Sequence, residues 1–277
     1  MKNIARGIAI SVLYLKYAVA GRIGRLLKKN RVQFIYFHHV FDHEEAGFEK
    51  IILNLSRDHF FISHSEAVER IRSGNIDKPY LSVSFDDGFK NCIKAAEIMD
   101  RNGIKACFFV SPAFTGKKDH EEITDICKEK FHRPPVEFLD WDDIKRLLSA
   151  GHEIGSHGMT HSDLSGMNGK MLKAEIADTF GILNERTGDV KHFSWPFGRF
   201  ENFSDAAARM VFDSGFISCS SAQRGCHISG ESDIRRLCIR RDHIMPNWPV
   251  HHVRYFLAKN SESSGSRTGR WPEGWQV

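Results

Sequence analysis

Seven short apolar segments recur along the chain, each with the length of a β-strand. Several are continuous apolar runs without alternation, which is typical of strands buried on both faces of a parallel sheet. The expected strands are Val32–Phe37, Tyr80–Phe85, Ala106–Val110, Glu153–Ser156, Lys191–Ser194, Phe216–Ser220 and Arg236–Arg240.

Segments with helical spacing lie between these strands. Asp140 is a suitable N-cap for one of them, and Gly103 and Gly151 follow two others as C-terminal stops. The expected helices are Phe89–Asn102, Trp141–Ala150, Lys170–Thr187 and Ser204–Ser214. Alternation of strands and helices predicts a parallel α/β fold. Seven strands leave two architectures open, an incomplete barrel and a doubly wound sheet.

Residues 1–31 differ from the rest of the chain. The run from Ile8 to Leu15 is almost wholly apolar, but it is shorter than the roughly 20 residues that a membrane span requires. From Tyr17 onward, cations and apolar residues occupy opposite helical faces, a pattern typical of a basic amphipathic helix on an anionic membrane surface. Two other interpretations stay open: a signal peptide, because Ala18-Val19-Ala20 resembles a cleavage site, and a helix packed on the domain.

The overall charge is dominated by this segment. The chain has 277 residues, with 39 Lys and Arg against 35 Asp and Glu, and a net charge of +4. Residues 1–31 hold eight of the cations and no acid, so the remainder has 31 cations against 35 acids, a net charge of −4. The body of the protein therefore lacks the positive charge expected of a nucleic-acid-binding domain.

Composition and cysteine usage narrow the class of protein and its expected location. The chain is 41% hydrophobic and 27% charged, as in globular proteins, and its six cysteines form no Cys-x-x-Cys pair. This pattern favours reduced thiols and a cytoplasmic location, with membrane association through residues 1–31 as an option, over a secreted or periplasmic one. We expect three parts: the N-terminal segment 1–31, a catalytic domain 32–259, and a flexible Ser/Gly-rich tail 260–277.

Polar and titratable residues follow at least five of the expected strands. The carboxyl ends of parallel strands meet at one edge of an α/β fold, which is where such folds build active sites. The residues at these strand ends are His38 and His39, Asp86 and Asp87, His157, Trp195 to Gly198, and Arg241 to His243. We therefore expect them to converge on one rim. The polar segment Thr115–Val136 follows the third strand on the same side, and we expect it to be irregular and to shape substrate access.

The chemistry of two of these groups points to metal-assisted hydrolysis. Asp86 and Asp87 are adjacent, and His157 and His161 are four residues apart. One carboxylate and two imidazoles can hold a divalent ion and leave a coordination position open for water, while the other carboxylate accepts a proton from that water.

These motifs, in this order, resemble those of the polysaccharide deacetylase family, the chitin-deacetylase-like carbohydrate esterases. Ser84-Phe85-Asp86-Asp87-Gly88 is similar to the first family motif, and the segment His157–His161 with Ser162-Asp163-Leu164 is similar to the second. Phe193–Gly198 is similar to the third, and Phe37-His38-His39-Val40 to an opening found in many bacterial members. The resemblance covers about residues 32–245.

The resemblance implies a fold, an activity and a set of roles. The fold would be an irregular seven-stranded (β/α) barrel of TIM-like type. The activity would be removal of the acetyl group from an N-acetylated sugar in a polysaccharide, a lipid-linked glycan or a small glycoside, with a divalent metal, foremost Zn²⁺. Asp86 would be the general base, and the metal ligands would be Asp87, His157 and His161.

Other roles are less well matched to the family. Many members carry an Arg in the third motif that pairs with the base; Ser194 stands there in this chain, so Arg240 or Arg241 would have to supply the charge. The general acid would be His243, with His38 as the alternative. The backbone N–H of Phe197, held by Pro196, would contact the oxyanion. Trp195 is either a sugar-stacking wall or part of the core.

Two further functions stay open beside deacetylation. A cyclic-amide hydrolase of the same fold, acting on a compound such as allantoin, would suit the missing third-motif Arg. A catalytically idle carbohydrate-binding relative would belong to a different functional class. The intact pair Asp86 and Asp87 argues against the idle relative, because a pure binder needs no base beside its metal.

Overall fold

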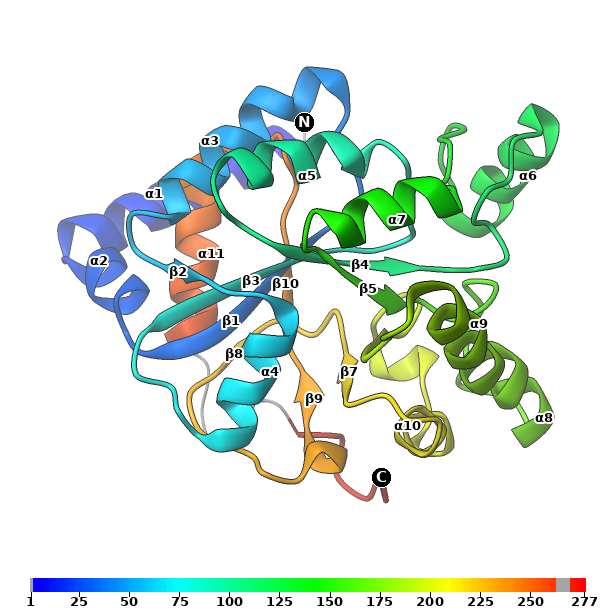
Figure 1. Cartoon of the computed structure of the whole chain (residues 1–277). Coiled ribbons are helices and arrows are strands. Elements are labelled where there is room, and N and C mark those ends of the chain that lie inside the picture. Colours follow the sequence, from blue (N-terminus) through cyan, green and yellow to red (C-terminus); the bar gives the residue numbers. More distant parts are fainter. Residues whose placement is uncertain (1, 263–269) are drawn as a thin grey trace.

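A parallel sheet forms the centre of the structure and curls around its own interior (Figure 1). The computed structural model describes residues 2–262 and 270–277. The neighbouring strands follow the order β10-β1-β3-β4-β5-β6-β7-β9, and each pair in this order is parallel where a ladder links it. Their bounds are β1 (Arg31–Phe37), β3 (Pro79–Phe85), β4 (Ala106–Val110), β5 (Glu153–Ser156), β6 (His192–Ser194), β7 (Ser218–Ser220), β9 (Cys238–Ile239) and β10 (Arg241–His243).

All seven strands expected from the sequence are present, and the predicted α/β class with a curled, barrel-like sheet is confirmed. The two ends of the strand order, β9 and β10, are joined along the chain by the single residue Arg240. Three short strands were not predicted: β2 (Phe60–Phe61), β8 (Cys226–His227) and β10. β2 and β8 are formed by two residues each outside the seven apolar segments, and β10 consists of polar residues.

Helices connect successive strands and cover the sheet (Figure 1). They are α3 (Glu45–Leu55), α4 (His64–Ser73), α5 (Cys92–Arg101), α6 (His120–Phe131), α7 (Trp141–Ser149), α8 (Gly169–Leu172), α9 (Asp178–Thr187), α10 (Asp205–Asp213) and α11 (Val250–Glu262), with short helical turns η1 (Asp42–Glu44), η3 (Phe200–Asn202) and η4 (Ile234–Arg236). The four predicted helices are confirmed in position. The Asp140 side chain accepts hydrogen bonds from the N–H groups of Asp142 and Asp143 and so caps α7, as expected. The segment expected as one helix over 170–187 is divided by the π-helical turn η2 (Lys173–Ala177).

The two faces of the sheet differ in composition. In β3, Leu81, Val83 and Phe85 belong to the main core, which also contains apolar residues of α3, α5 and α7. The residues between them, Ser82 and Ser84, are also buried. Because successive side chains of a strand point to opposite faces, these serines face the interior of the curled sheet. The interior is therefore partly polar and can accommodate a charged side chain.

The N-terminal residues form two helices, α1 (Lys2–Val19) and α2 (Arg22–Leu27), which lie beside α11 (Figure 1). Ile23 and Leu27 of α2 are buried in the main core, so this part matches the expectation of a packed helix. In the described residues, no helix has both the length and the apolar character needed to cross a membrane.

The C-terminal residues differ from the expected flexible tail. Residues 260–262 continue α11, and Ser261 is buried. Beyond residues 263–269, which lie outside the described part, the Trp271 and Trp275 rings stack with centroids 5.8 Å apart. Trp271 also donates a hydrogen bond of 2.7 Å to the backbone oxygen of Arg235. Packing of partly buried aromatic rings therefore holds Trp271 and Trp275 against the main core, in a region whose Ser/Gly-rich sequence had suggested flexibility.

Several histidines are buried in the core. His59 accepts a hydrogen bond of 2.8 Å from Arg31 at Nε2 and donates one of 3.1 Å from Nδ1 to the Leu55 oxygen. Burial, followed by the charge of Arg31, lowers the pKa of His59 to about 3. Burial also lowers the pKa values of His192 and His227 to about 3. These side chains stay neutral in the folded protein at pH values where an exposed histidine is charged.

We predict that acid destabilises the fold through these histidines. The unfolded chain binds their protons near the ordinary pKa of 6.5, whereas the folded chain binds them only near 3, so the free energy of unfolding should fall as the pH drops below 6.5. Each histidine adds a slope of about 1.4 kcal/mol per pH unit. Urea unfolding at several pH values measures the slope. His59→Gln should reduce the slope of the free energy of unfolding against pH by the contribution of one buried histidine. The exposed-site control His120→Gln should leave this slope unchanged. Equal slopes for His59→Gln and the parent would contradict the assignment.

Candidate active site

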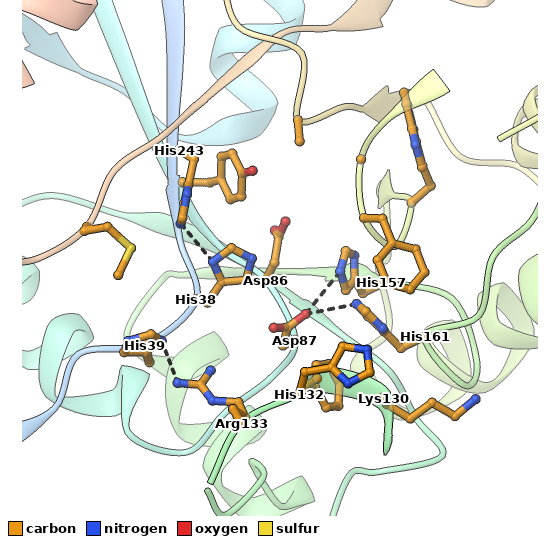
Figure 2. Close-up of a pocket in the computed structure, with 17 residues that line it drawn as sticks. His38, His39, Asp86, Asp87, Lys130, His132, Arg133, His157, His161 and His243 are labelled. Atoms are coloured by element: carbon orange, nitrogen blue, oxygen red, sulfur yellow. Dashed lines mark hydrogen bonds and ion pairs between the residues drawn. The ribbon is translucent and has the colours of Figure 1, made fainter. Parts of the chain in front are cut away.

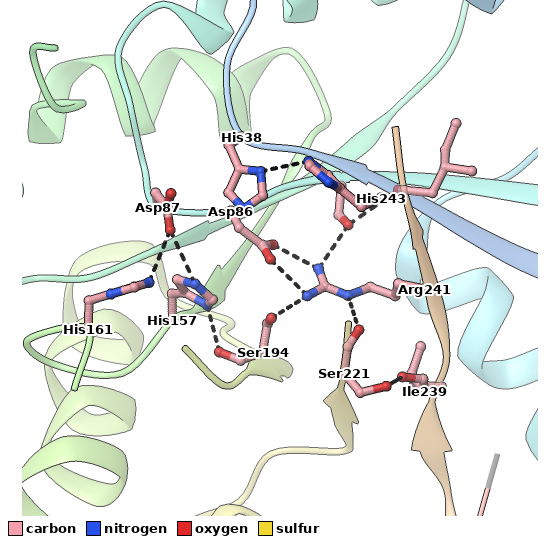
Figure 3. Close-up of polar contacts among 12 residues, drawn as sticks. His38, Asp86, Asp87, His157, His161, Ser194, Ser221, Ile239, Arg241 and His243 are labelled. Carbon is pink, nitrogen blue, oxygen red and sulfur yellow. Dashed lines mark hydrogen bonds and ion pairs between the residues drawn. The ribbon is translucent and has the colours of Figure 1, made fainter. Parts of the chain in front are cut away.

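Two carboxylates follow β3 and diverge within two residues. The Asp86 N–H donates to the Phe37 oxygen at 3.0 Å, which keeps Asp86 in line with the sheet. Asp87 then adopts a φ of 73° and Gly88 a φ of 70°. A positive φ is uncommon outside glycine, and Asp tolerates it better than most residues. The turn sends the two carboxylates to different partners (Figure 3).

Asp87 lies against the histidine pair. Its Oδ1 atom is 3.4 Å from Nε2 of His157 and 3.3 Å from Nε2 of His161. One ligand atom from each of the three residues lies within 4.8 Å of the others, and all three residues are buried. Figure 2 shows these side chains converging on one wall of a pocket.

The histidines are oriented by the surrounding backbone. Nδ1 of His157 donates to the Ser194 oxygen at 2.7 Å, which leaves the Nε2 lone pair facing Asp87. His161 has a φ of 51°, a second positive value for a non-glycine residue at this site. The buried carboxylate of Glu175 accepts hydrogen bonds from the N–H groups of Met159 (2.9 Å) and Thr160 (3.0 Å), and so holds the turn between the two histidines.

Glu175 was not singled out from the sequence. It lies in the π-helical turn η2, in a segment expected to be an ordinary surface helix. A π-helical turn redirects side chains relative to an α-helix and is frequent at functional sites. A helical pattern alone does not reveal such a turn.

The three side chains fit a divalent metal. Asp87 Oδ1 is buried and makes no regular hydrogen bond within the described residues, although both imidazoles are close. A buried carboxylate oxygen without a hydrogen bond is costly unless a cation compensates it. One carboxylate oxygen and two imidazole nitrogens are suitable ligands for zinc and related ions, and three protein ligands leave a position open for solvent or substrate.

Asp86 is paired with a different cation. The Arg241 guanidinium donates to both of its oxygens, at 2.7 Å and 2.8 Å (Figure 3). It also donates to the hydroxyls of Ser84 (3.2 Å) and Ser194 (2.6 Å) and to the Ser221 oxygen (2.9 Å). In the motif that the sequence resembles, an Arg commonly stands at the position of Ser194. Here Arg241 supplies the cation instead and reaches the Asp86 carboxylate from β10.

This pair sets the charge of Asp86. Burial opposes ionisation of the carboxyl group, but the charge and hydrogen bonds of Arg241, together with the nearby His157 and His38, outweigh it and lower the pKa of Asp86. Arg241 is itself fully buried, with its guanidinium carbon 4.4 Å from the centre of the Tyr36 ring. Removal of one partner from a buried pair typically costs about 3–5 kcal/mol. Asp86 is thus held ionised and in a fixed orientation beside the triad.

His38 and His243 form a second histidine pair on the opposite wall. Nδ1 of His38 is 3.1 Å from Nε2 of His243. Burial, followed by the charge of His38, lowers the pKa of His243 to about 3. His243 is therefore neutral, and its Nε2 accepts the shared hydrogen bond when His38 carries a proton on Nδ1. Figures 2 and 3 show His38 closer than His243 to the two carboxylates.

Two aromatic residues after β6 have different environments. Trp195 is fully buried and stacks on Phe203 at 4.3 Å, and its Nε1 donates to the Arg199 oxygen, so its ring belongs to the core. Of the two interpretations left open for Trp195, its burial favours the core, although the residue also borders the pocket. Phe197 is 46% exposed and borders the pocket, with a φ of 64° that follows the buried Pro196. No hydrogen bond within the described residues uses the Phe197 N–H.

The remaining wall comes from the segment that was expected to be irregular. It contains helix α6, whose N-cap Asp119 accepts a hydrogen bond from Glu122, so that expectation is wrong. The end of α6 and the residues after it border the pocket: Lys130, Phe131, His132 and Arg133. Arg133 donates to His39 Nδ1 at 3.0 Å and lies over the Phe89 ring. The location on the rim was expected, but not the helix or its cationic residues.

Comparisons with known proteins agree with this geometry. A family model described as polysaccharide deacetylase matches residues 73–212. A probable peptidoglycan-N-acetylglucosamine deacetylase of Arthroderma benhamiae is 31% identical over 114 residues, which are 41% of this chain and 22% of the relative. A chitooligosaccharide deacetylase of Sinorhizobium fredii is 26% identical over 132 residues, 46% of this chain and 50% of the relative. The chain thus spans half or less of these curated relatives. The structure of IcaB from Ammonifex degensii has a similar fold, with a TM-score of 0.66 at 16% identity, covering 83% of this chain and 98% of that one.

We predict that metal binding depends on the triad and not on Asp86. His157→Ala should weaken Zn²⁺ binding by at least about 100-fold, because loss of a direct ligand costs more than loss of a supporting contact. Asp86→Asn should bind the ion with nearly unchanged affinity. Isothermal titration of the metal-free proteins measures both, and circular dichroism checks their folding. If His157→Ala bound Zn²⁺ as tightly as the parent, the ligand assignment would be incorrect.

Proposed function

Because this chain belongs to the polysaccharide deacetylase family, we propose that it is a metal-dependent hydrolase that removes the acetyl group from an N-acetylated sugar. The proposal rests on the observation that the adjacent carboxylates of Asp86 and Asp87 have different partners. Asp87 faces two imidazoles, and Asp86 is held ionised in a bidentate pair with Arg241. A binding site needs only the first arrangement, whereas hydrolysis needs both.

The residues can divide the reaction as follows. Asp87, His157 and His161 would hold a divalent ion, which when bound would supply Lewis acidity toward a carbonyl group and toward water. The oxygen of a water molecule attacks the acetyl carbon, and Asp86 accepts a proton from this water. Arg241 keeps Asp86 in the ionised form that this step requires. The C–N bond then breaks, and the products are acetate and a free amine.

The amine nitrogen must be protonated as it leaves, because an amide anion is too basic to depart. We assign this role to His38, with His243 as a positioning residue. The low pKa of His243 supports this order, since the neutral His243 ring can accept a hydrogen bond from Nδ1 of His38. The Nε2 atom of His38 is then the donor available to the substrate.

Phe197 is suited to two roles at the pocket wall. Its N–H is available to the oxyanion that forms on the acetyl oxygen, and buried Pro196 fixes the preceding backbone. Its exposed ring offers an apolar face to the sugar, in place of Trp195.

The alternatives have less support. The cyclic-amide reaction was suggested by the missing Arg of the third motif, but Arg241 supplies an equivalent charge to Asp86. An idle binder would have no use for an ionised carboxylate beside the triad. The names of the two curated relatives favour N-acetylglucosamine in an oligosaccharide or in peptidoglycan, and the ligand set of one oxygen and two nitrogens favours Zn²⁺.

We predict that the protein releases acetate from N-acetylated glucosamine oligomers in a metal-dependent reaction. A chelator should abolish release and added Zn²⁺ should restore it. Asp86→Asn should lower kcat by about 10²–10⁴-fold, the usual contribution of a general base, while binding metal normally. Enzymatic quantification of acetate measures the reaction on chitin oligomers and peptidoglycan fragments, and quantification of allantoate measures ring opening of allantoin.

The outcomes separate the three candidate functions. Release from the sugars supports deacetylation, and ring opening of allantoin without acetate release would replace it with the cyclic-amide reaction. Binding of sugars without turnover by the metal-loaded protein would identify a binder. Exposed His120→Gln is the matched control and should retain full activity.

We predict that His38 is needed only for poor leaving groups. His38→Ala should lower acetate release from the amide by about 10²–10⁴-fold. It should hydrolyse an activated aryl acetate nearly as fast as the parent, because that leaving group departs without a proton. His243→Ala should show a smaller loss on the amide and an altered pH–rate profile. If His243→Ala lost far more amide activity than His38→Ala, the assigned roles would have to be exchanged.

A further inference from the structure

Helix α1 has one face packed on the protein and one face exposed. On the packed face, the Tyr14 ring lies 5.4 Å from His251, and the Tyr17 ring lies 5.4 Å from Tyr255. The Ser11 hydroxyl is within hydrogen-bonding distance of His251 Nε2, at 2.9 Å. These contacts hold α1 along α11 in a fixed rotation.

The exposed face of α1 is apolar. Ile8, Val12, Leu15 and Val19 are 61%, 48%, 61% and 82% exposed, and their spacing of four, three and four residues places them in one stripe. With Leu13, α1 contains five of the ten exposed large hydrophobic residues of the described chain. Isolated exposed apolar residues are normal, but a continuous stripe on a helix that is already packed on its other side indicates a contact surface.

Exposed cations lie on the same N-terminal segment as this stripe. The exposed basic residues of α1, α2 and the turn after α2 are Arg6, Lys16, Arg25, Lys28 and Lys29. None of them forms an ion pair within residues 2–262 and 270–277, whereas Arg22 is paired with Glu262. Residues 1–31 contain no acid, and the rest of the chain has a net charge of −4. The positive charge is thus concentrated in the N-terminal segment that carries the stripe.

We propose that α1 and α2 bind the surface of an anionic lipid bilayer, with the α1 axis in the plane of the membrane. The stripe of Ile8, Val12, Leu15 and Val19 enters the boundary between headgroups and acyl chains, and the cations of the same segment contact the anionic headgroups. This combination of an apolar face and basic residues is the usual design of interfacial helices.

Charge argues against a second copy of the chain as the occupant. A symmetric dimer through the stripe would bring the same cations of both copies together, and residues 1–31 offer no acid to compensate them. An anionic bilayer satisfies both the apolar and the charged components.

The location also suits a substrate at a membrane. The groove beside the stripe is lined by Ile8, Val12 and Leu15 together with Pro249. Only a few residues earlier, Met245 borders the active-site pocket. The bilayer contact and the pocket are therefore connected by the short segment 245–249.

Vesicle cosedimentation of the full chain tests the proposal. The protein should bind vesicles of phosphatidylglycerol and phosphatidylcholine, bind vesicles of phosphatidylcholine alone at least about tenfold more weakly, and dissociate at high salt. Val12→Asp with Leu15→Asp should reduce binding at least about tenfold. Val19→Asp should also weaken it and cannot unfold the protein by burying a charge, because Val19 is 82% exposed.

The matched control is Met171→Asp on α8, which is 48% exposed and distant from α1 (Figure 1). It should bind vesicles like the parent. Absence of binding to anionic vesicles, or equal binding by Val19→Asp, Val12→Asp with Leu15→Asp and the control, would overturn the proposal. A dimer seen by light scattering that Val19→Asp dissociates, without vesicle binding, would show that the stripe is a dimer interface instead. Acetate release from soluble oligomers is measured in parallel, because it should be unaffected and so reports on the proposed catalytic function separately.

Discussion

The buried ion pair between Arg241 and Asp86 is the interaction on which the rest of the site depends. A carboxylate in a water-poor interior would ordinarily be protonated and useless as a base. The bidentate contact keeps it charged, and the hydroxyls of Ser84 and Ser194 with the Ser221 carbonyl satisfy the remaining donors of the guanidinium. Such a pair adds little net stability, because desolvation offsets the attraction. Its value lies in the protonation state and orientation that it imposes.

Backbone conformation separates the functions of neighbouring residues. Among the described non-glycine residues, positive φ angles occur at Asp87, His132, His161 and Phe197, all of which border the pocket. Each costs a small amount of conformational energy, which the surrounding packing must offset. At Asp87 the turn directs one carboxylate to the imidazoles while its neighbour points to Arg241. Two adjacent acids can thus differ in partner and role without differing in burial.

Much of this arrangement could be predicted from the sequence, because strand ends in a parallel sheet converge. The seven apolar segments were enough to predict the strands of the sheet, and the motifs around Asp86 and His157 were enough to predict where the candidate site lies. What the sequence did not reveal depends on tertiary contacts. The sequence left Arg240 and Arg241 as alternatives, and the contact from the short polar strand β10 identifies Arg241 as the partner of Asp86. Glu175 acts from a π-helical turn, and Arg133 follows a helix in a segment that looked irregular. Trp195 was ambiguous, because a ring that suits a sugar also suits a core, and only its stacking on Phe203 decided the matter.

The position of Arg241 in the chain has a consequence for biosynthesis. Asp86 is made early, yet its cationic partner lies 155 residues later, on the strand that completes the sheet beside β1. A nascent chain therefore presents the carboxylate and the imidazoles before the guanidinium exists. Until β10 docks, that acid must remain hydrated or take up a proton. The paired, ionised state of Asp86 then emerges at a late step of folding, together with docking of β10 on β1.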